Sequence, residues 1–280
     1  MTDRTTPRRP MTPEALAGDL RDVWASMGVL LDELDTEDFD APTDCPGWDV
    51  ADVVAHVVGT ELMLSGVDAP DVDVPDAPHL RNDIARMNET WIIARRELTP
   101  DVLVSEFHDV VRDRSDALDA LTQAEVDAES WTPAGHATLG RFLQIRVFDT
   151  WIHEQDIRLA IGQAGHETGH AVERSLAEVA LGIGYVVGKR AGLSDGQSVR
   201  IDLPGPQPAR YDVLVTDGRA AVVDGLPGDP TTTLTSDSSV FIRLIAGRRD
   251  PIAALEAGLV SVSGDLELGE RVVAALPYTI

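Results

Sequence analysis

RVFDTWIHEQDIR, residues 146–158, is the stretch that decides how the surrounding chain folds. Its apolar spacing predicts the middle of a helix that runs over residues 140–161. Residues four apart on a helix lie one above the other, so Asp149 and His153 share one face. The rest of that face is largely apolar and is formed by Phe142, Ile145, Ile152 and Ala160. We therefore expect a carboxylate and an imidazole to point into a protein core.

This pair needs a partner, because an unsatisfied carboxylate or imidazole is costly in apolar surroundings. A divalent metal ion is one such partner, and it requires a third ligand from another part of the chain. His56 is the candidate, since residues 50–65 form a helical pattern that is apolar on nearly every side, as in a buried helix. The predicted metal ligands are therefore His56, Asp149 and His153. Two histidines and a carboxylate with one open position make a common catalytic zinc site, and the same ligands also suit ferrous iron.

Other interpretations of these residues stay open at this point. An aspartate and a histidine four apart are often a solvated pair on a helix surface, and His56 alone could be a core histidine bonded to nearby groups. Asp156 lies three residues after His153 on nearly the same face and could orient its ring. Glu154 is expected to point to solvent.

Neighbouring residues suggest further roles. Cys45 lies just ahead of the helix over residues 50–65, where a thiol could become nucleophilic, although a small packed side chain is the expected role. Asp44 and Trp48 are expected to shape the mouth of the site. The glycines in residues 182–188 superficially resemble a phosphate-binding loop, but their spacing is wrong and no serine or threonine follows the lysine.

The composition excludes several classes of partner. Acidic residues outnumber basic residues by 48 to 23, which gives a formal net charge of −25 and argues against nucleic acid or an anionic membrane. No apolar run reaches the ~18 residues of a membrane span, and the N-terminus lacks the apolar core of a secretory signal. The single cysteine excludes an internal disulfide framework. A cytoplasmic protein is expected.

Periodicity along the chain predicts an α+β fold made of two different domains. Residues 1–11 are expected to be a disordered lead, residues 12–165 a bundle of four or five helices, and residues 166–280 a smaller α+β domain. The expected helices cover residues 12–34, 50–65, 79–98, 100–121, 140–161, 170–191, 236–246 and 266–276. The expected strands cover residues 199–203, 211–216, 220–223, 231–235 and 259–262, with a strong hairpin signal at Asp217-Gly218.

Two segments resemble the signatures of a known family. PTDCPGWDVADVVAHVVG, residues 42–59, resembles the N-terminal signature of the mycothiol-dependent maleylpyruvate isomerase family. DTWIHEQDIRLA, residues 149–160, resembles the second metal-binding segment of that family. The resemblance covers nearly the whole chain from about residue 12. It implies a DinB-like four-helix bundle that holds zinc, followed by a sterol-carrier-like α+β domain.

The resemblance also implies roles for individual residues. His56, Asp149 and His153 would be the zinc ligands, although the family often has glutamate at the position of Asp149. The shorter aspartate would hold the metal closer to its own helix. The family uses an arginine of the C-terminal domain near the active site, and Arg248 in FIRLIAGRR, residues 241–249, is the best match. The alternative for Arg248 is a solvated arginine at a helix end.

The implied function is that of an enzyme that depends on a metal and on mycothiol, a low-molecular-weight thiol. We expect an isomerase or S-transferase that acts on a small electrophilic substrate with a carboxylate, which Arg248 would bind. Two alternatives stay open, because one scaffold can host several chemistries. One is a metal-dependent hydrolase, and the other is a non-catalytic small-molecule-binding protein. A monomer is expected.

Overall fold

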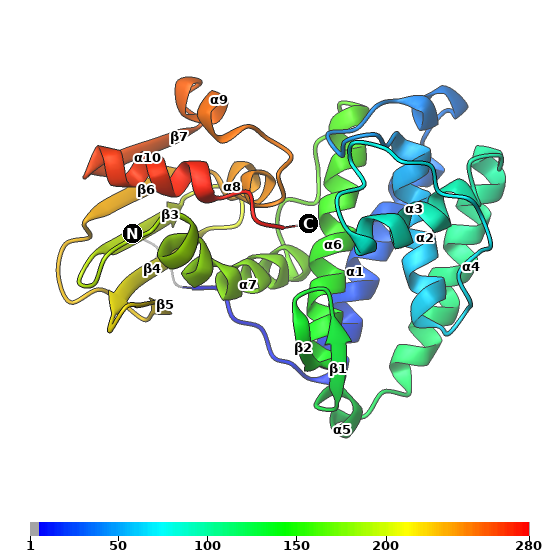
Figure 1. The fold of residues 1–280 in the computed structure, drawn as a ribbon. Coiled ribbons are helices and arrows are strands. Elements are labelled where there is room, and N and C mark those ends of the chain that lie inside the picture. Colours follow the sequence, from blue (N-terminus) through cyan, green and yellow to red (C-terminus); the bar gives the residue numbers. More distant parts are fainter. Residues whose placement is uncertain (1–5, 280) are drawn as a thin grey trace. The chain divides into compact units, whose positions relative to one another are not determined.

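The computed structural model describes residues 6–279, which divide into two compact units (Figure 1). Residues 10–166 form a helical unit, and residues 167–279 form an α+β unit together with residues 6–9. The predicted fold class is confirmed. Of the expected lead, residues 1–5 lie outside the described residues. Within residues 6–9, the Thr6 hydroxyl donates to the carbonyl of Arg210 at 3.1 Å.

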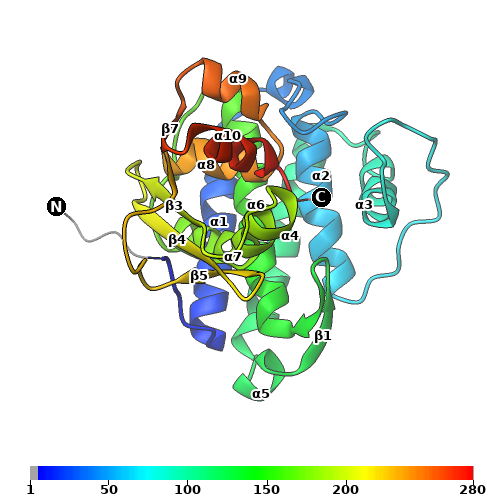
Figure 2. The ribbon, with the colours of Figure 1, turned by 60° about the vertical axis from the view of Figure 1, so that its left-hand side comes forward.

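The helical unit is built around four long helices. In chain order it contains α1 (Pro13–Asp32), a 3₁₀ helix (Thr36–Asp40), α2 (Val50–Leu64), α3 (Asp83–Ile93), α4 (Pro100–Asp119), α5 (Gln123–Val126), β1 (Glu129–Thr132), β2 (Gly135–Thr138) and α6 (Leu139–Ala160). Both α1 and α2 contact α4 and α6, so the four long helices enclose one core. Figure 2 shows α3 outside this bundle, beyond α2.

Local sequence sets where the two central helices of this unit begin. The Asp49 carboxylate caps α2 by accepting a hydrogen bond from the backbone of Asp52 at 2.8 Å. The Thr138 hydroxyl caps α6 by accepting from the backbone of Arg141 at 3.1 Å. These caps fix the register in which each helix presents its side chains to the core.

Short elements escaped the sequence prediction. The segment before α6 lies outside every expected helix and strand, but it contains a hairpin in which β1 pairs with β2. Each strand has only four residues, too few for a clear alternation of apolar and polar side chains. The Thr132 hydroxyl donates to the Gly135 carbonyl at 2.7 Å and supports the turn.

The α+β unit contains a five-stranded sheet. Its elements are α7 (His170–Tyr185), a π-helical turn (Val186–Arg190), β3 (Ser198–Leu203), β4 (Ala209–Thr216), β5 (Arg219–Val223), β6 (Thr232–Ser236), α8 (Ser238–Ile245), α9 (Pro251–Glu256), β7 (Val260–Gly264) and α10 (Leu266–Ala275). The strand order is β5-β4-β3-β6-β7, with β3 and β6 parallel and the other neighbours antiparallel. The predicted hairpin joins β4 to β5, and Asp217 and Gly218 have the positive φ (52° and 70°) of a type I′ turn.

The glycine-rich residues 182–188 lie in α7 and the π-helical turn, so they form no phosphate-binding loop. A Cβ atom at Gly184 would lie 2.7 Å from the carbonyl oxygen of Ala220, and one at Gly188 would lie 2.8 Å from the Ala220 Cβ. The glycines therefore allow this helix to approach β5 closely. Among the described helices of both units, none is long and apolar enough to cross a membrane.

Glu154 is buried, and the expectation that it points to solvent is wrong. Its carboxylate accepts hydrogen bonds from Ser26 Oγ at 2.7 Å and Arg158 Nε at 2.8 Å. It also pairs with His166 Nδ1 at 2.7 Å. Helix α6 packs against α1, α2 and β1, so partners cover it on several sides and a polar side chain there must be satisfied internally.

The contact between His166 and Glu154 should make stability depend on pH. Burial alone lowers the pKa of His166, but Glu154 and Asp22 outweigh burial and raise it above its usual value. The stabilisation is therefore complete below the unfolded pKa of about 6.5 and is lost as pH rises through the folded pKa. We expect His166→Asn, which tolerates the φ of 51° at this position, to lower the urea midpoint more at pH 6 than at pH 9. Equal losses at both pH values would contradict this account.

Close packing of α2 against α3 makes a second prediction about stability. A Cβ atom at Gly59 would lie 2.3 Å from the Trp91 Cβ, so Gly59→Ala forces these helices apart. We expect a loss of about 1–3 kcal/mol in the free energy of unfolding, measured by urea titration. At Gly18 in α1, such a Cβ would meet no atom within 4 Å among the described residues beyond its own stretch of helix, so Gly18→Ala is the control. It should stabilise the protein by about 0.5–1 kcal/mol through helix propensity, and a similar loss for both variants would refute the packing argument.

Candidate metal centre

His56, Asp149 and His153 lie together in the structure. His56 comes from the middle of α2, and the other two residues lie one turn apart on the neighbouring helix α6. His56 Nε2 lies 3.2 Å from Asp149 Oδ2, and His153 Nε2 lies 3.8 Å from Asp149 Oδ1. One ligand atom from each residue lies within 4.8 Å of the other two. A tetrahedral zinc ion with bonds of about 2.0–2.1 Å separates its ligand atoms by roughly 3.4 Å, so this spacing fits a single ion.

The three side chains differ in their access to solvent. Both histidine side chains are 5% exposed, whereas the Asp149 side chain is 31% exposed. The cluster is therefore most accessible to solvent on the side of the carboxylate. The histidines are enclosed by the bundle, which keeps their rings in place.

Burial and charge give His56 and Asp149 the protonation states that metal binding requires. Burial lowers the pKa of His56 to about 4 although Asp149 acts to raise it, so the ring is neutral at pH 7. Burial acts to raise the pKa of Asp149, but Arg146 and the two histidines outweigh burial and hold it well below its usual range. A neutral imidazole and an ionised carboxylate are the forms that bind metals.

The surroundings of His153 also suit a metal ligand. His153 Nδ1 lies 3.1 Å from Asp156 Oδ2, the position expected for Asp156. An imidazole that donates from Nδ1 to such a carboxylate keeps a lone pair on Nε2, which is the atom that a metal would bind. His153 Nε2 lies on the side of Asp149, 3.8 Å from its Oδ1. His56 Nδ1 is buried and has no hydrogen-bond partner within the described part of the chain.

Trp48 forms a wall of the cluster. Its ring centroid lies 5.1 Å from that of His56 and 5.7 Å from that of His153. The indole N–H donates to Glu89 Oε2 at 3.2 Å, which fixes the plane of the ring. Trp48 was expected only to shape the mouth of the site. In the structure it lies directly against both imidazoles and excludes water from them.

Cys45 is buried and lies close to His153. Its sulfur belongs to a second group of possible ligand atoms, with His153 and Asp156, that lie within 4.8 Å of one another. A carboxylate next to a thiol disfavours the thiolate, whereas reactive cysteines lie in electropositive surroundings. This environment supports the packed role expected for Cys45.

Sequence reasoning assigned no role to a chain of buried ion pairs that ends at Asp149. Arg146 pairs with Asp149 and with Glu61 of α2, and Arg114 of α4 pairs with the other oxygen of Glu61. Two signals could have revealed this chain. Arg146 lies three residues before Asp149 and thus on the same helix face. Glu61 is an acidic residue at the end of an apolar helical pattern.

Arg248, the predicted substrate-binding residue, belongs to the α+β unit. It lies just after α8, where its Nη1 donates to the carbonyl of Ala246 at 3.0 Å. Gly247 has a φ of 68°, so the chain turns sharply at this point. The role of Arg248 stays a prediction.

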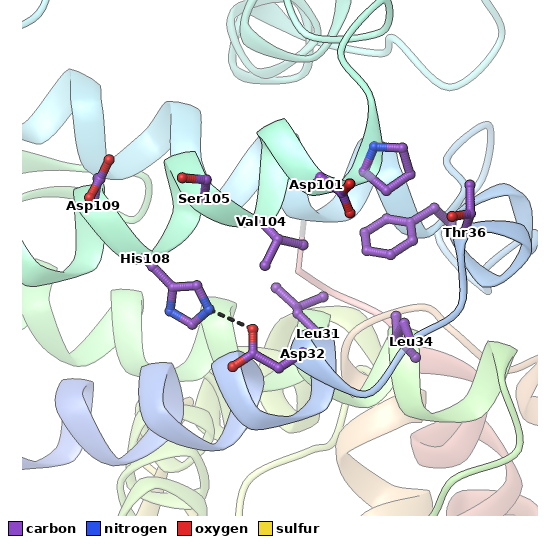
Figure 3. A pocket seen from close by; sticks show the side chains of 11 residues that line it. Leu31, Asp32, Leu34, Thr36, Asp101, Val104, Ser105, His108 and Asp109 are labelled. Carbon is purple, nitrogen blue, oxygen red and sulfur yellow. Dashed lines mark hydrogen bonds and ion pairs between the residues drawn. The ribbon is translucent and has the colours of Figure 1, made fainter.

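A surface hollow in the helical unit contains none of these residues (Figure 3). It lies between the end of α1, the 3₁₀ helix and the start of α4. His108 Nε2 pairs there with Asp32 Oδ1 at 2.8 Å, and both side chains are exposed. An exposed pair of this kind contributes about 0–1 kcal/mol, so we assign the hollow no function.

Fold and site together define a two-domain protein with a helical bundle that gathers two histidines and an aspartate. The family model of the mycothiol maleylpyruvate isomerase N-terminal domain matches residues 6–158, and the chain belongs to this family. The model of the SCP-2 sterol transfer family matches residues 189–277.

Solved structures show the same two-domain fold. The crystal structure of the mycothiol-dependent maleylpyruvate isomerase is similar with a TM-score of 0.59 and 20% sequence identity, over 94% of this chain and 96% of that chain. A histidine-to-alanine mutant of that isomerase is similar over the same shares, with a TM-score of 0.56 and 19% identity. No curated protein sequence matches this chain.

The geometry predicts which histidine substitutions abolish metal binding. We expect His56→Ala to weaken Zn²⁺ binding by more than about 100-fold, because even partners behind a ligand contribute 10- to 100-fold. His108→Ala removes an exposed histidine of the same unit and should bind Zn²⁺ like the wild type. Competition with a chromophoric chelator measures both affinities. Equal Zn²⁺ affinity of wild type and His56→Ala would show that this cluster is not the metal site.

Proposed function

We propose that this protein is a zinc-dependent enzyme that uses mycothiol to isomerise or S-conjugate a small electrophilic substrate with a carboxylate. The observation that supports this proposal most directly is the convergence of His56, Asp149 and His153, with access from the side of Asp149. Membership of the mycothiol maleylpyruvate isomerase N-terminal domain family supports a thiol as the second reactant.

Each residue of the site has its own role in the proposed reaction. His56 and His153 would hold zinc through neutral imidazoles, and Asp149 would supply a negative charge. Zinc bound there would lower the pKa of a thiol, so that a thiolate exists at neutral pH. Trp48 keeps water away from the imidazoles. Arg248 is proposed to hold the substrate carboxylate through two parallel hydrogen bonds.

The proposed reaction needs no reactant beyond the thiol and the electrophilic substrate. The thiolate sulfur forms a bond to an electrophilic alkene carbon, and the alkene electron pair moves toward the neighbouring carbonyl. Rotation about the resulting single bond followed by loss of the thiolate gives the isomer. If a proton is taken up instead, the thiol remains attached and the product is a thioether.

Two other functions would use the same residues differently. A hydrolase would place water where the thiol binds, since a metal also lowers the pKa of water. A non-catalytic binding protein would use its α+β unit, which matches the SCP-2 sterol transfer family, to carry a small apolar molecule. The two enclosed histidines beside an accessible carboxylate favour a reactive metal centre over the binding protein, and family membership favours a thiol over water as the second reactant.

Dependence on thiol separates these functions. The zinc-loaded protein is incubated with maleylpyruvate, with and without mycothiol, and the products are identified by mass spectrometry and NMR. We expect conversion only when both zinc and mycothiol are present, and His153→Ala should lose at least about 100-fold in rate with the loss of a ligand. His108→Ala is the matched control. Hydrolysis products formed without thiol would identify a hydrolase, isomerisation that persists without thiol would refute the role of mycothiol, and conversion by no combination would reject the proposed activity on this substrate.

A further inference from the structure

Four side chains of alternating charge form a line through the interior of the bundle. Arg114 Nε donates to Glu61 Oε2 at 3.0 Å, and Arg146 Nε donates to Glu61 Oε1 at 3.0 Å. Arg146 then pairs through Nη1 with Asp149 Oδ2. The line connects α4, α2 and α6, and it ends at the carboxylate between the two histidines.

Burial makes this line expensive to form. The side chains of Arg146 and Glu61 are only 4% and 1% exposed. Replacing buried ion pairs by apolar side chains is often neutral or even stabilising, so bundle stability does not account for their presence. A role in holding Asp149 does account for it, because Arg146 contacts the same carboxylate oxygen that lies 3.2 Å from His56 Nε2.

The shape of arginine suits this role. An aspartate carboxylate rotates easily about its last torsion, which is broad and roughly two-fold. The guanidinium of Arg146 is a planar fork, so it can bind Glu61 through Nε and Nη2 while Nη1 faces Asp149. Glu61 thus fixes the plane of the fork, and the fork in turn fixes the orientation of the carboxylate. A lysine carries the same charge but offers only one nitrogen.

We propose that Arg146, held in place by Glu61, is a positioning residue that orients Asp149 for metal binding. This inference rests on the proposed metal centre. Its consequence is that metal affinity and coordination geometry depend on two residues that do not themselves contact the ion. Because Asp149 is already oriented, its carboxylate loses less conformational freedom when the metal binds, and the affinity is higher.

The test compares Arg146→Lys with the wild type through Zn²⁺ affinity and through the visible spectrum of the Co²⁺-substituted protein, which reports coordination geometry. We expect Zn²⁺ affinity to fall about 10- to 100-fold and the Co²⁺ spectrum to change. Arg95→Lys is the matched control. Arg95 is also buried in the helical unit and makes a two-pronged pair with Glu106 at 2.7 and 2.9 Å. It should change neither quantity.

Each outcome decides between distinct accounts. Unchanged or tighter Zn²⁺ binding by folded Arg146→Lys, with an unchanged Co²⁺ spectrum, would refute the positioning role. If the wild type itself bound no Zn²⁺, the proposed metal centre would fail instead. Should Arg146→Lys not fold, Glu61→Gln tests the same point. It keeps an acceptor for Arg146 but removes the charge that holds it, so weaker Zn²⁺ binding with an altered Co²⁺ spectrum is again expected. Wild-type values for Glu61→Gln would likewise refute the role.

Discussion

The interior of the helical unit depends on the contacts that the Asp149 carboxylate makes. This carboxylate faces a guanidinium on one side and two imidazoles on the other, and each of these groups comes from a buried position. A carboxylate in such surroundings is tolerated only when opposite charge and hydrogen bonds replace its water. Arg146 supplies that charge, and a cation bound by the two imidazoles and the carboxylate would complete the set.

Apolar packing around these groups makes them chemically useful. Helix α2 is buried along most of its length. Burial keeps His56 neutral and keeps water from forming hydrogen bonds with its ring. The same packing places Trp48 against both histidines and leaves the side of Asp149 accessible. Two enclosed histidines beside a more exposed carboxylate are the arrangement that the proposed function requires.

Both units combine partners for buried polar groups with close packing at glycines. In the helical unit, buried polar groups are matched by partners from other helices, as the contacts of Glu154 and Glu61 show. The α+β unit also matches buried polar groups, as the pairs Arg200–Asp212 and Tyr211–Leu176 show, and it adds close approach of backbone segments. Helix α7 lies on the sheet near β5 because Gly184 and Gly188 leave room for Ala220. Glycines in that segment therefore serve packing, and their resemblance to a nucleotide-binding loop has no functional meaning.

By itself, the sequence determined what depends on neighbours within a few residues. The helices with clear periodicity, the cap at Asp49, the turn at Asp217-Gly218 and the shared face of Asp149 and His153 all follow from local spacing, and the structure contains each of them. Short elements such as the hairpin before α6 have too few residues to show a period.

Only the tertiary structure decided which distant side chains meet. Glu154 is hydrogen-bonded to Ser26, which lies 128 positions away in the sequence, and Arg146 to Glu61, which lies 85 positions away. Neither pairing leaves a local pattern, because a buried charge looks like a solvated one until the covering helix is known. His56 was assigned to Asp149 from residue type, an apolar helix and a family resemblance, and packing of α2 against α6 brought the two within 3.2 Å. Local chemistry thus selected the candidate ligands, whereas the packing of helices decided how they are held.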